Sequence, residues 1–120
     1  MELTKKLQIP PGIPIFLINV PEDFQLGDAK IAKKIDPTVA VLLFAENSKT
    51  LMNSSSKPAI TAAEADRLSW IAYPKAGQLQ TDLNRDKLVT ALAPHNIEGV
   101  RLVSIDEVWS AMRFRPKKIK

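Results

Sequence analysis

The sequence predicts an α/β domain: a mixed, mostly parallel sheet of about five or six strands, helices on both faces and a C-terminal antiparallel hairpin. Three continuous apolar runs, at 15–20, 39–44 and 68–73, are typical of strands buried on both faces. Polar, helix-forming stretches alternate with these runs, as in α/β folds. Two more strand-like runs, 100–105 and 108–115, are joined by a short turn that predicts a hairpin.

Two weaker elements precede the second strand. Residues 1–12 end in consecutive prolines, and since proline fixes φ and removes a donor, an extended lead-in is expected. A weak alternation over 25–36 favours a short edge strand, with a turn of helix as the alternative.

Besides a short helix that Ser48 can cap and that runs through Met52, two helices are expected between the later strands. The first is predicted over 61–68, because T-A-A-E at its start is a capping-box pattern, and the serine-rich stretch 53–58 before it is interpreted as a loop. The second is predicted over 81–93, capped by Thr81 or Asp82.

Length and charge predict one domain over 13–116, followed by a basic tail at 117–120. The net charge is +4, and three lysines of the tail supply most of it. Such a tail can bind the phosphate backbone of a nucleic acid. A solvated chain end is the preferred interpretation, since no aromatic side chains are interleaved with the lysines.

Several classes of function are disfavoured. The chain has no cysteine and one histidine, His95, which leaves no thiolate chemistry, metal cluster or Ser-His-Asp triad to expect. The four glycines form no phosphate-binding loop, so no nicotinamide, flavin or ATP cofactor is predicted. Ser54 and Lys57 match S-x-x-K only within a loop. No apolar stretch is long enough to span a membrane, and a cytoplasmic location is expected.

Polar side chains cluster at the predicted strand ends, where ligands bind in open α/β sheets. Asn19 follows the first strand, and residues 46–48 follow the second. The candidate binding residues after the third strand are Tyr73, Lys75, Asp82, Asn84 and Arg85. A helix start and a lysine there favour an anion. The competing interpretation is a strand exit followed by an ordinary helix cap.

The last predicted strand offers a second candidate surface. Trp109, Arg113 and Arg115 share one face by period two, and an indole beside guanidinium groups can bind a phosphate or a carboxylate. The same groups also fit a packed tryptophan with arginines at the rim. An exposed edge at 108–115 could pair with a second copy, so a homodimer is a further expectation.

Three segments resemble a family of small bacterial domains to which no activity is assigned. They are YPK at 73–75, TDLNRD at 81–86 and the final WSAMRFRP at 109–116. The resemblance covers about residues 13–116 and implies a compact α/β domain in a bacterial, cytoplasmic protein. The turn at 76–80, AGQLQ, departs from the lysine- or serine-rich turn of the family. The order of elements also looks like the carboxyl half of a methyltransferase-type Rossmann domain, without its glycine loop.

The sequence therefore favours a non-enzymatic binding or regulatory module for a partner protein or a small anionic ligand. An enzyme is the alternative, with Asp82 as base and with Lys75 and Arg85 holding an anionic substrate. Weak nucleic-acid binding through the basic tail is a third possibility.

Overall fold

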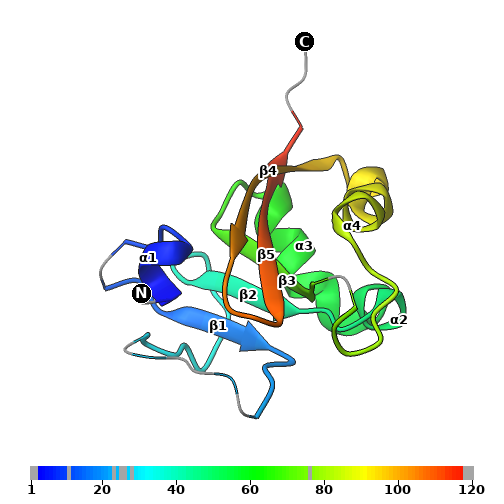
Figure 1. The fold of residues 1–120 in the computed structure, drawn as a ribbon. Helices are drawn as coiled ribbons and strands as arrows, with labels where there is room; N and C mark the ends of the chain where they lie inside the picture. The colour runs from blue at the N-terminus through cyan, green and yellow to red at the C-terminus, as the bar shows by residue number, and fades with distance from the viewer. Residues whose placement is uncertain are drawn as a thin grey trace.

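Five strands form one mixed sheet in the order β1-β2-β3-β5-β4 (Figure 1). The computed structural model describes residues 3–10, 12–22, 24, 27, 29–75 and 77–117. The strands are β1 (Ile15–Ile18), β2 (Ala40–Phe44), β3 (Ser69–Pro74), β4 (Ile97–Ser104) and β5 (Trp109–Pro116). The helices are α1 (Leu3–Lys6), α2 (Ser48–Leu51), α3 (Lys57–Glu64) and α4 (Arg85–Leu92), with 3-10 turns η1 (Ser54–Ser56) and η2 (Ala93–His95).

The direction of the strands changes within the sheet. β1, β2 and β3 are parallel neighbours, whereas β5 is antiparallel to both β3 and β4. The predicted mixed α/β sheet with a C-terminal hairpin is therefore confirmed, although half of the strand pairings are antiparallel.

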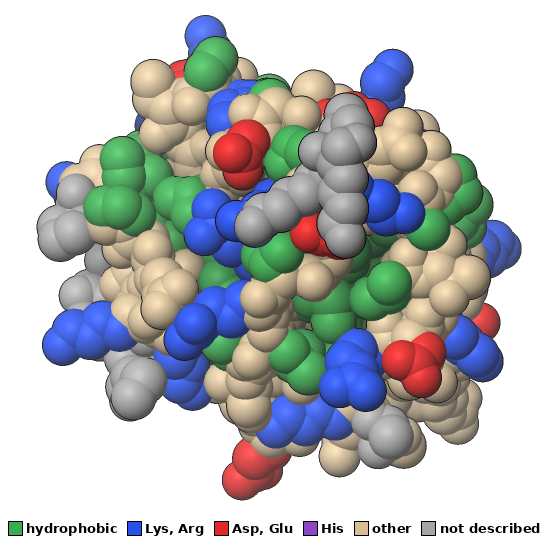
Figure 2. All heavy atoms as spheres, turned by 90° about the horizontal axis from the view of Figure 1, so that it is seen from above, with side chains coloured by type: hydrophobic (Ala, Val, Ile, Leu, Met, Phe, Trp, Pro, Cys, Tyr) green, Lys and Arg blue, Asp and Glu red, His purple; other side chains and the backbone are tan. Residues whose placement is uncertain are grey.

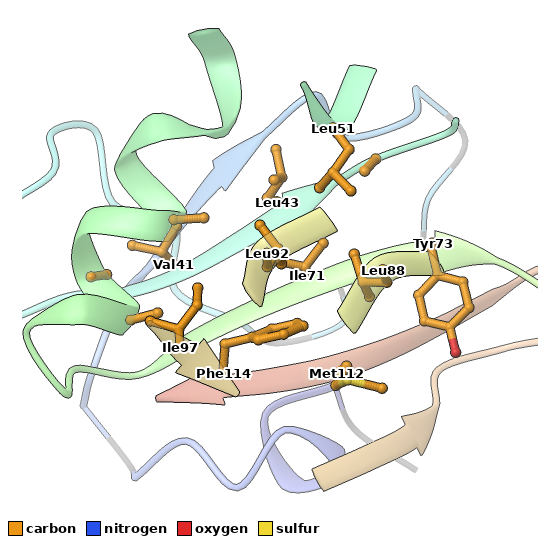
Figure 3. Close-up of a cluster of buried hydrophobic side chains, with 14 of the residues drawn as sticks. Val41, Leu43, Leu51, Ile71, Tyr73, Leu88, Leu92, Ile97, Met112 and Phe114 are labelled. Atoms are coloured by element: carbon orange, nitrogen blue, oxygen red, sulfur yellow. The ribbon is translucent and has the colours of Figure 1, made fainter. Parts of the chain in front are cut away.

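The sheet separates two hydrophobic clusters. The helix-side cluster contains Leu43, Ile71 and Phe114 from the strands and Leu88 and Leu92 from α4 (Figure 3). Because successive side chains of a strand alternate between faces, their neighbours in sequence fill the opposite cluster.

The opposite cluster contains Leu42, Trp70 and Trp109 from the strands, and it is closed by Leu3 and Leu7 of the N-terminal segment. Loop residues between β1 and β2 also pack there. α2, α3 and α4 all contribute to the helix-side cluster, so the described residues do not show full helical layers on both faces.

Three predicted elements differ from the structure. Residues 3–6 form a helical turn instead of an extended lead-in, because Leu3 and Leu7 are buried against the sheet. The edge strand expected over 25–36 is reduced to one parallel bridge between Ile31 and Ile15, and residues 25, 26 and 28 lie outside the described residues. The exposed edge predicted at 108–115 is wrong, since β5 lies between β3 and β4.

The helices begin elsewhere than predicted. α3 runs over Lys57–Glu64, so the T-A-A-E pattern lies inside it. Pro58 is in its first turn, where a backbone N–H has no acceptor within the helix, so the missing N–H of proline costs no hydrogen bond. α4 begins at Arg85 and is capped by Asn84, not by Thr81 or Asp82.

Candidate functional site

A pocket of about 580 Å³ lies at the edge of the sheet where the parallel strands end. We call it the carboxyl-edge pocket. Its lining comes from five separate stretches of chain: Asn19 and Pro21; Phe44 and Glu46; Thr50, Asn53 and Ser55; Leu79; and Val108 and Trp109. This is the position at which open α/β sheets bind ligands.

Two aromatic rings contribute to the apolar part of the lining, beside Pro21, Leu79 and Val108. Phe44 ends β2 and Trp109 begins β5, and their ring centroids lie 5.0 Å apart at 86°, an edge-to-face contact. Phe24 packs on the same Phe44 ring at 4.8 Å. Phe44 is 1% exposed and Trp109 is 5% exposed, so both rings are held in place by the core.

Amide and hydroxyl groups form the polar part of the lining. Asn19 has φ 59, a left-handed conformation that asparagine tolerates better than most residues. Its Nδ2 donates to Ser55 Oγ at 3.1 Å. Asn53 Oδ1 accepts the backbone N–H of Ser55 at 3.0 Å and so caps η1. Among the described residues, no hydrogen bond is made by the Oδ1 of Asn19 or by the Nδ2 of Asn53.

The wall formed by α2 is fixed by side-chain caps. Asn47 Oδ1 accepts the backbone N–H of Thr50 at 2.9 Å. Asp82 Oδ1 accepts the backbone N–H of Ser48 at 2.8 Å, which fastens the loop after β3 to the first residue of α2. Hydrogen bonds from the Ser48 backbone and hydroxyl lower the pKa of the Asp82 carboxyl.

The rest of the T-D-L-N-R-D segment starts α4. Thr81 Oγ1 accepts the N–H of Leu83 at 3.0 Å, and Asn84 Oδ1 accepts the N–H of Lys87 at 2.9 Å. Arg85 points to solvent and lies 3.8 Å from the neighbouring Asp86. The segment is thus a helix start that also braces one wall of the pocket.

Tyr73 and Lys75 lie away from the pocket. Tyr73 belongs to the helix-side cluster, where burial raises the pKa of its phenol, opposed by the charge of Arg85. Lys75 Nζ donates to Ser104 Oγ at 2.7 Å, at the end of β4.

The predicted tryptophan–arginine face exists, but its members have different surroundings. Trp109 lines the carboxyl-edge pocket. Arg113 lies opposite Trp70 in the sheet, and its Nε is buried without a hydrogen-bond partner among the described residues. Arg115 lies opposite Glu98 of β4.

Of the predicted binding residues, only Asn19 and Trp109 line the carboxyl-edge pocket. The predicted convergence of Asn19 with Glu46 is confirmed, because both line it. Asn53 and Ser55 were not predicted, since a serine-rich stretch was interpreted as a loop. An asparagine before consecutive serines is itself a capping signal and could have identified η1.

Among residues 3–117 as far as they are described, no group of three or more His, Asp or Glu could hold a metal ion. None of the described helices is long and apolar enough to cross a membrane. A second pocket of about 410 Å³ lies between α3 and α4 and is bordered by Ile60, Leu92 and His95.

Comparisons of the chain with known protein families, with curated proteins and with solved structures found no match, so the residues of the pocket are the basis for assigning it a function.

Proposed function

We propose that this chain is a small non-enzymatic binding module whose carboxyl-edge pocket holds a small molecule. The observation that carries the proposal is the convergence of Asn19, Asn53 and Ser55 on the ring pair of Phe44 and Trp109. Ligand sites combine an apolar, largely preformed cavity with a few placed polar groups, and this pocket has both.

The charge of the lining favours a neutral or cationic ligand. Glu46 contributes a carboxylate, and none of the described lining residues is Lys or Arg. A ligand anion held in a partly closed pocket needs a compensating positive group. The anionic ligand expected from the sequence would need Lys75 or Arg85, whose side chains are directed to Ser104 and Asp86.

The resemblance to small bacterial domains is compatible with this proposal. Its T-D-L-N-R-D motif maps to the segment that joins Asp82 to Ser48 and so supports α2 beside Thr50. In this proposal the motif positions a wall of the pocket. The likeness to a methyltransferase half-domain stays a prediction, and the order β3, α4 and a closing hairpin is compatible with it.

The enzyme alternative has less support. Asp82 is engaged with Ser48, and its lowered pKa makes it a weaker base. Lys75 and Arg85 do not line the carboxyl-edge pocket. The proposed base and the proposed anion holders therefore do not meet around one cavity.

Nucleic-acid binding through the tail stays a prediction, because 118–120 lie outside the described residues. Seen from the end at which the chain finishes, Lys and Arg side chains are spread over the surface among hydrophobic and acidic ones (Figure 2). Binding that weakens steeply with salt and is lost on deleting 117–120 would support this alternative.

A matched series of small aromatic probes tests the proposal. Benzyl alcohol, benzylamine and benzoate share a ring and differ in charge. In a two-dimensional ¹H–¹⁵N NMR titration, we expect the alcohol and the amine to shift the amide signals of Asn19, Asn53 and Ser55, and benzoate to shift them least. Glu46→Gln should weaken the amine by about three- to fivefold and leave the alcohol unchanged.

Glu64→Gln, on α3 and outside the pocket lining, is the matched control and should change neither affinity. Shifts confined to other surfaces with all three probes would refute the proposed site. A preference for benzoate would keep the site but overturn the proposed ligand charge.

A further inference from the structure

One edge of the sheet is open. Among the described residues, β4 pairs only with β5 and presents a row of unpaired backbone groups on its outer side. The opposite edge is partly covered, because Ile15 of β1 exchanges backbone hydrogen bonds with Lys30 and Ala32, each at 2.8 Å. A long open edge strand is a template for another strand.

Apolar side chains are exposed on this edge. Val100 is 39% exposed and Leu102 is 44% exposed, although both lie in the middle of β4. In contrast, Ile97 at the start of β4 is buried in the helix-side cluster. The middle of the strand therefore carries the surface that a partner would cover.

A shift in register brings two opposite charges to one face of β4. Glu98 lies opposite Arg115 of β5, and Arg101 lies opposite Arg113. Residues 113 and 115 share a face, because side chains two apart in a strand point the same way. Residues 98 and 101 would point to opposite faces in a regular strand, but the irregularity between Gly99 and Arg101 puts them on one face.

Among the described residues, Arg101 forms no ion pair. Its cross-strand neighbour is Arg113, and like charges directly opposite each other are unfavourable. The one ion pair among the described residues joins Arg85 and Asp86. A carboxylate on the outer side of β4 would relieve this repulsion.

We propose that β4 pairs antiparallel with β4 of a second copy, so that Glu98 faces the partner's Arg101 and Arg101 faces the partner's Glu98. Glu98 and Arg101 lie on either side of the Gly99–Val100 peptide, and a two-fold axis between the two β4 strands, midway between their Gly99–Val100 peptides, produces both pairs at once. A two-fold interface requires such self-complementarity. The contact would also cover Val100 and Leu102 and continue the sheet through both copies.

Charge exchange tests this interface. Sedimentation equilibrium over about 1 µM to 1 mM protein should show a monomer–dimer equilibrium for the natural chain. Arg101→Glu or Glu98→Arg alone should weaken the dimer by at least about tenfold, because like charges then meet across the axis. The double exchange Glu98→Arg with Arg101→Glu should restore the dimer to within about threefold of the original.

Lys87→Glu on α4, which also changes an exposed charge, is the control and should leave the dimer unchanged. Circular dichroism of each variant checks that it is folded. In the natural chain, β4 amides that do not bond to β5 should exchange more slowly at dimer-forming concentrations. A monomer at every concentration would overturn the proposal, as would a dimer that both single variants leave unchanged or that the double exchange fails to restore.

Discussion

The carboxylate of Asp82 accepts the backbone N–H of Ser48, and this one bond joins the loop after β3 to the start of α2. Both residues are near the surface, and the helix that the bond contacts carries Thr50, which lines the carboxyl-edge pocket. Asn19 is comparable: its left-handed backbone directs an amide to Ser55. Pocket geometry thus depends on a few polar side chains outside the hydrophobic clusters.

The hydrogen bond between Asp82 and Ser48, which contacts the α2 wall of the pocket, is expected to depend on pH. The folded-state pKa of Asp82 lies below the ordinary value of 3.8, so its contribution is present above about pH 3.8 and is lost as the pH falls through the lowered value. We expect the Ser48 amide, corrected for intrinsic exchange rates, to lose protection from hydrogen exchange in that acid range. Asp82→Ala should remove the protection at neutral pH, and Asp82→Asn should keep part of it.

Asp36 provides the matched comparison. Its pKa is also lowered, first by the side-chain hydroxyl of Thr38 and then by the Thr38 backbone, but it lies in the loop before β2. Asp36→Ala should leave the exchange of the Ser48 amide unchanged. Equal protection of Ser48 in the natural chain and in Asp82→Ala would show that the bond does not hold α2.

The sequence identified Asp82 as important but assigned it a different role. Thr81, Asp82 and Asn84 are all good N-cap residues, and local preference does not distinguish between them. The distinction comes from Ser48, which is 34 residues away and donates its backbone N–H to Asp82. Asn84 then caps α4 by accepting the N–H of Lys87. A long-range contact of this kind leaves no trace in local composition.

At the scale of elements, β4 contains one glycine whose role in packing the sequence did not predict. The apolar run at 100–105 placed the start of this strand after Gly99, whereas it begins at Ile97. The glycine leaves room for a neighbour, because a side chain at this position would meet the Met112 thioether of β5. Sequence preferences associate glycine with the ends of helices and strands. The reason for Gly99 is its contact with β5, which only the structure shows.

Gly99→Ala is therefore expected to destabilise the fold. The cost should fall near the lower end of about 1–3 kcal/mol, because a methionine side chain can shift to make room. Urea unfolding measures the change. In a Met112→Ala background the same substitution should cost less than about 0.5 kcal/mol, since the clash is gone. An equal cost in both backgrounds would mean that the loss arises from the backbone of β4.

At the scale of the whole molecule, the two clusters depend on the same three central strands. β2, β3 and β5 direct alternate side chains into the helix-side cluster and the opposite cluster. The apolar runs predicted these strands, because their hydrophobicity is continuous. The order of the sheet could not be predicted in the same way, since it depends on which strand is buried on both faces; Ala111, Met112 and Phe114 of β5 are buried, whereas much of β4 is exposed.

Because β2, β3 and β5 belong to both hydrophobic clusters, we expect the protein to unfold in a single cooperative transition. Trp70 and Trp109 both belong to the opposite cluster, so their fluorescence reports that face, whereas far-ultraviolet circular dichroism includes α3 and α4 on the other. The two signals should have the same midpoint in urea. A fluorescence midpoint at a lower urea concentration would mean that the opposite cluster opens independently.

The place of β5 in the sheet also bears on how the protein is made. Since β5 follows β4 in the chain but lies between β3 and β4, β4 has no strand to join until the ribosome has synthesised β5. A nascent chain that ends before Trp109 would leave the edge of β3 open, with Trp70 and Ile71 unprotected beside it. Completion of the sheet is therefore expected to follow synthesis of β5, and in the interval the exposed apolar edge is expected to favour aggregation or chaperone binding.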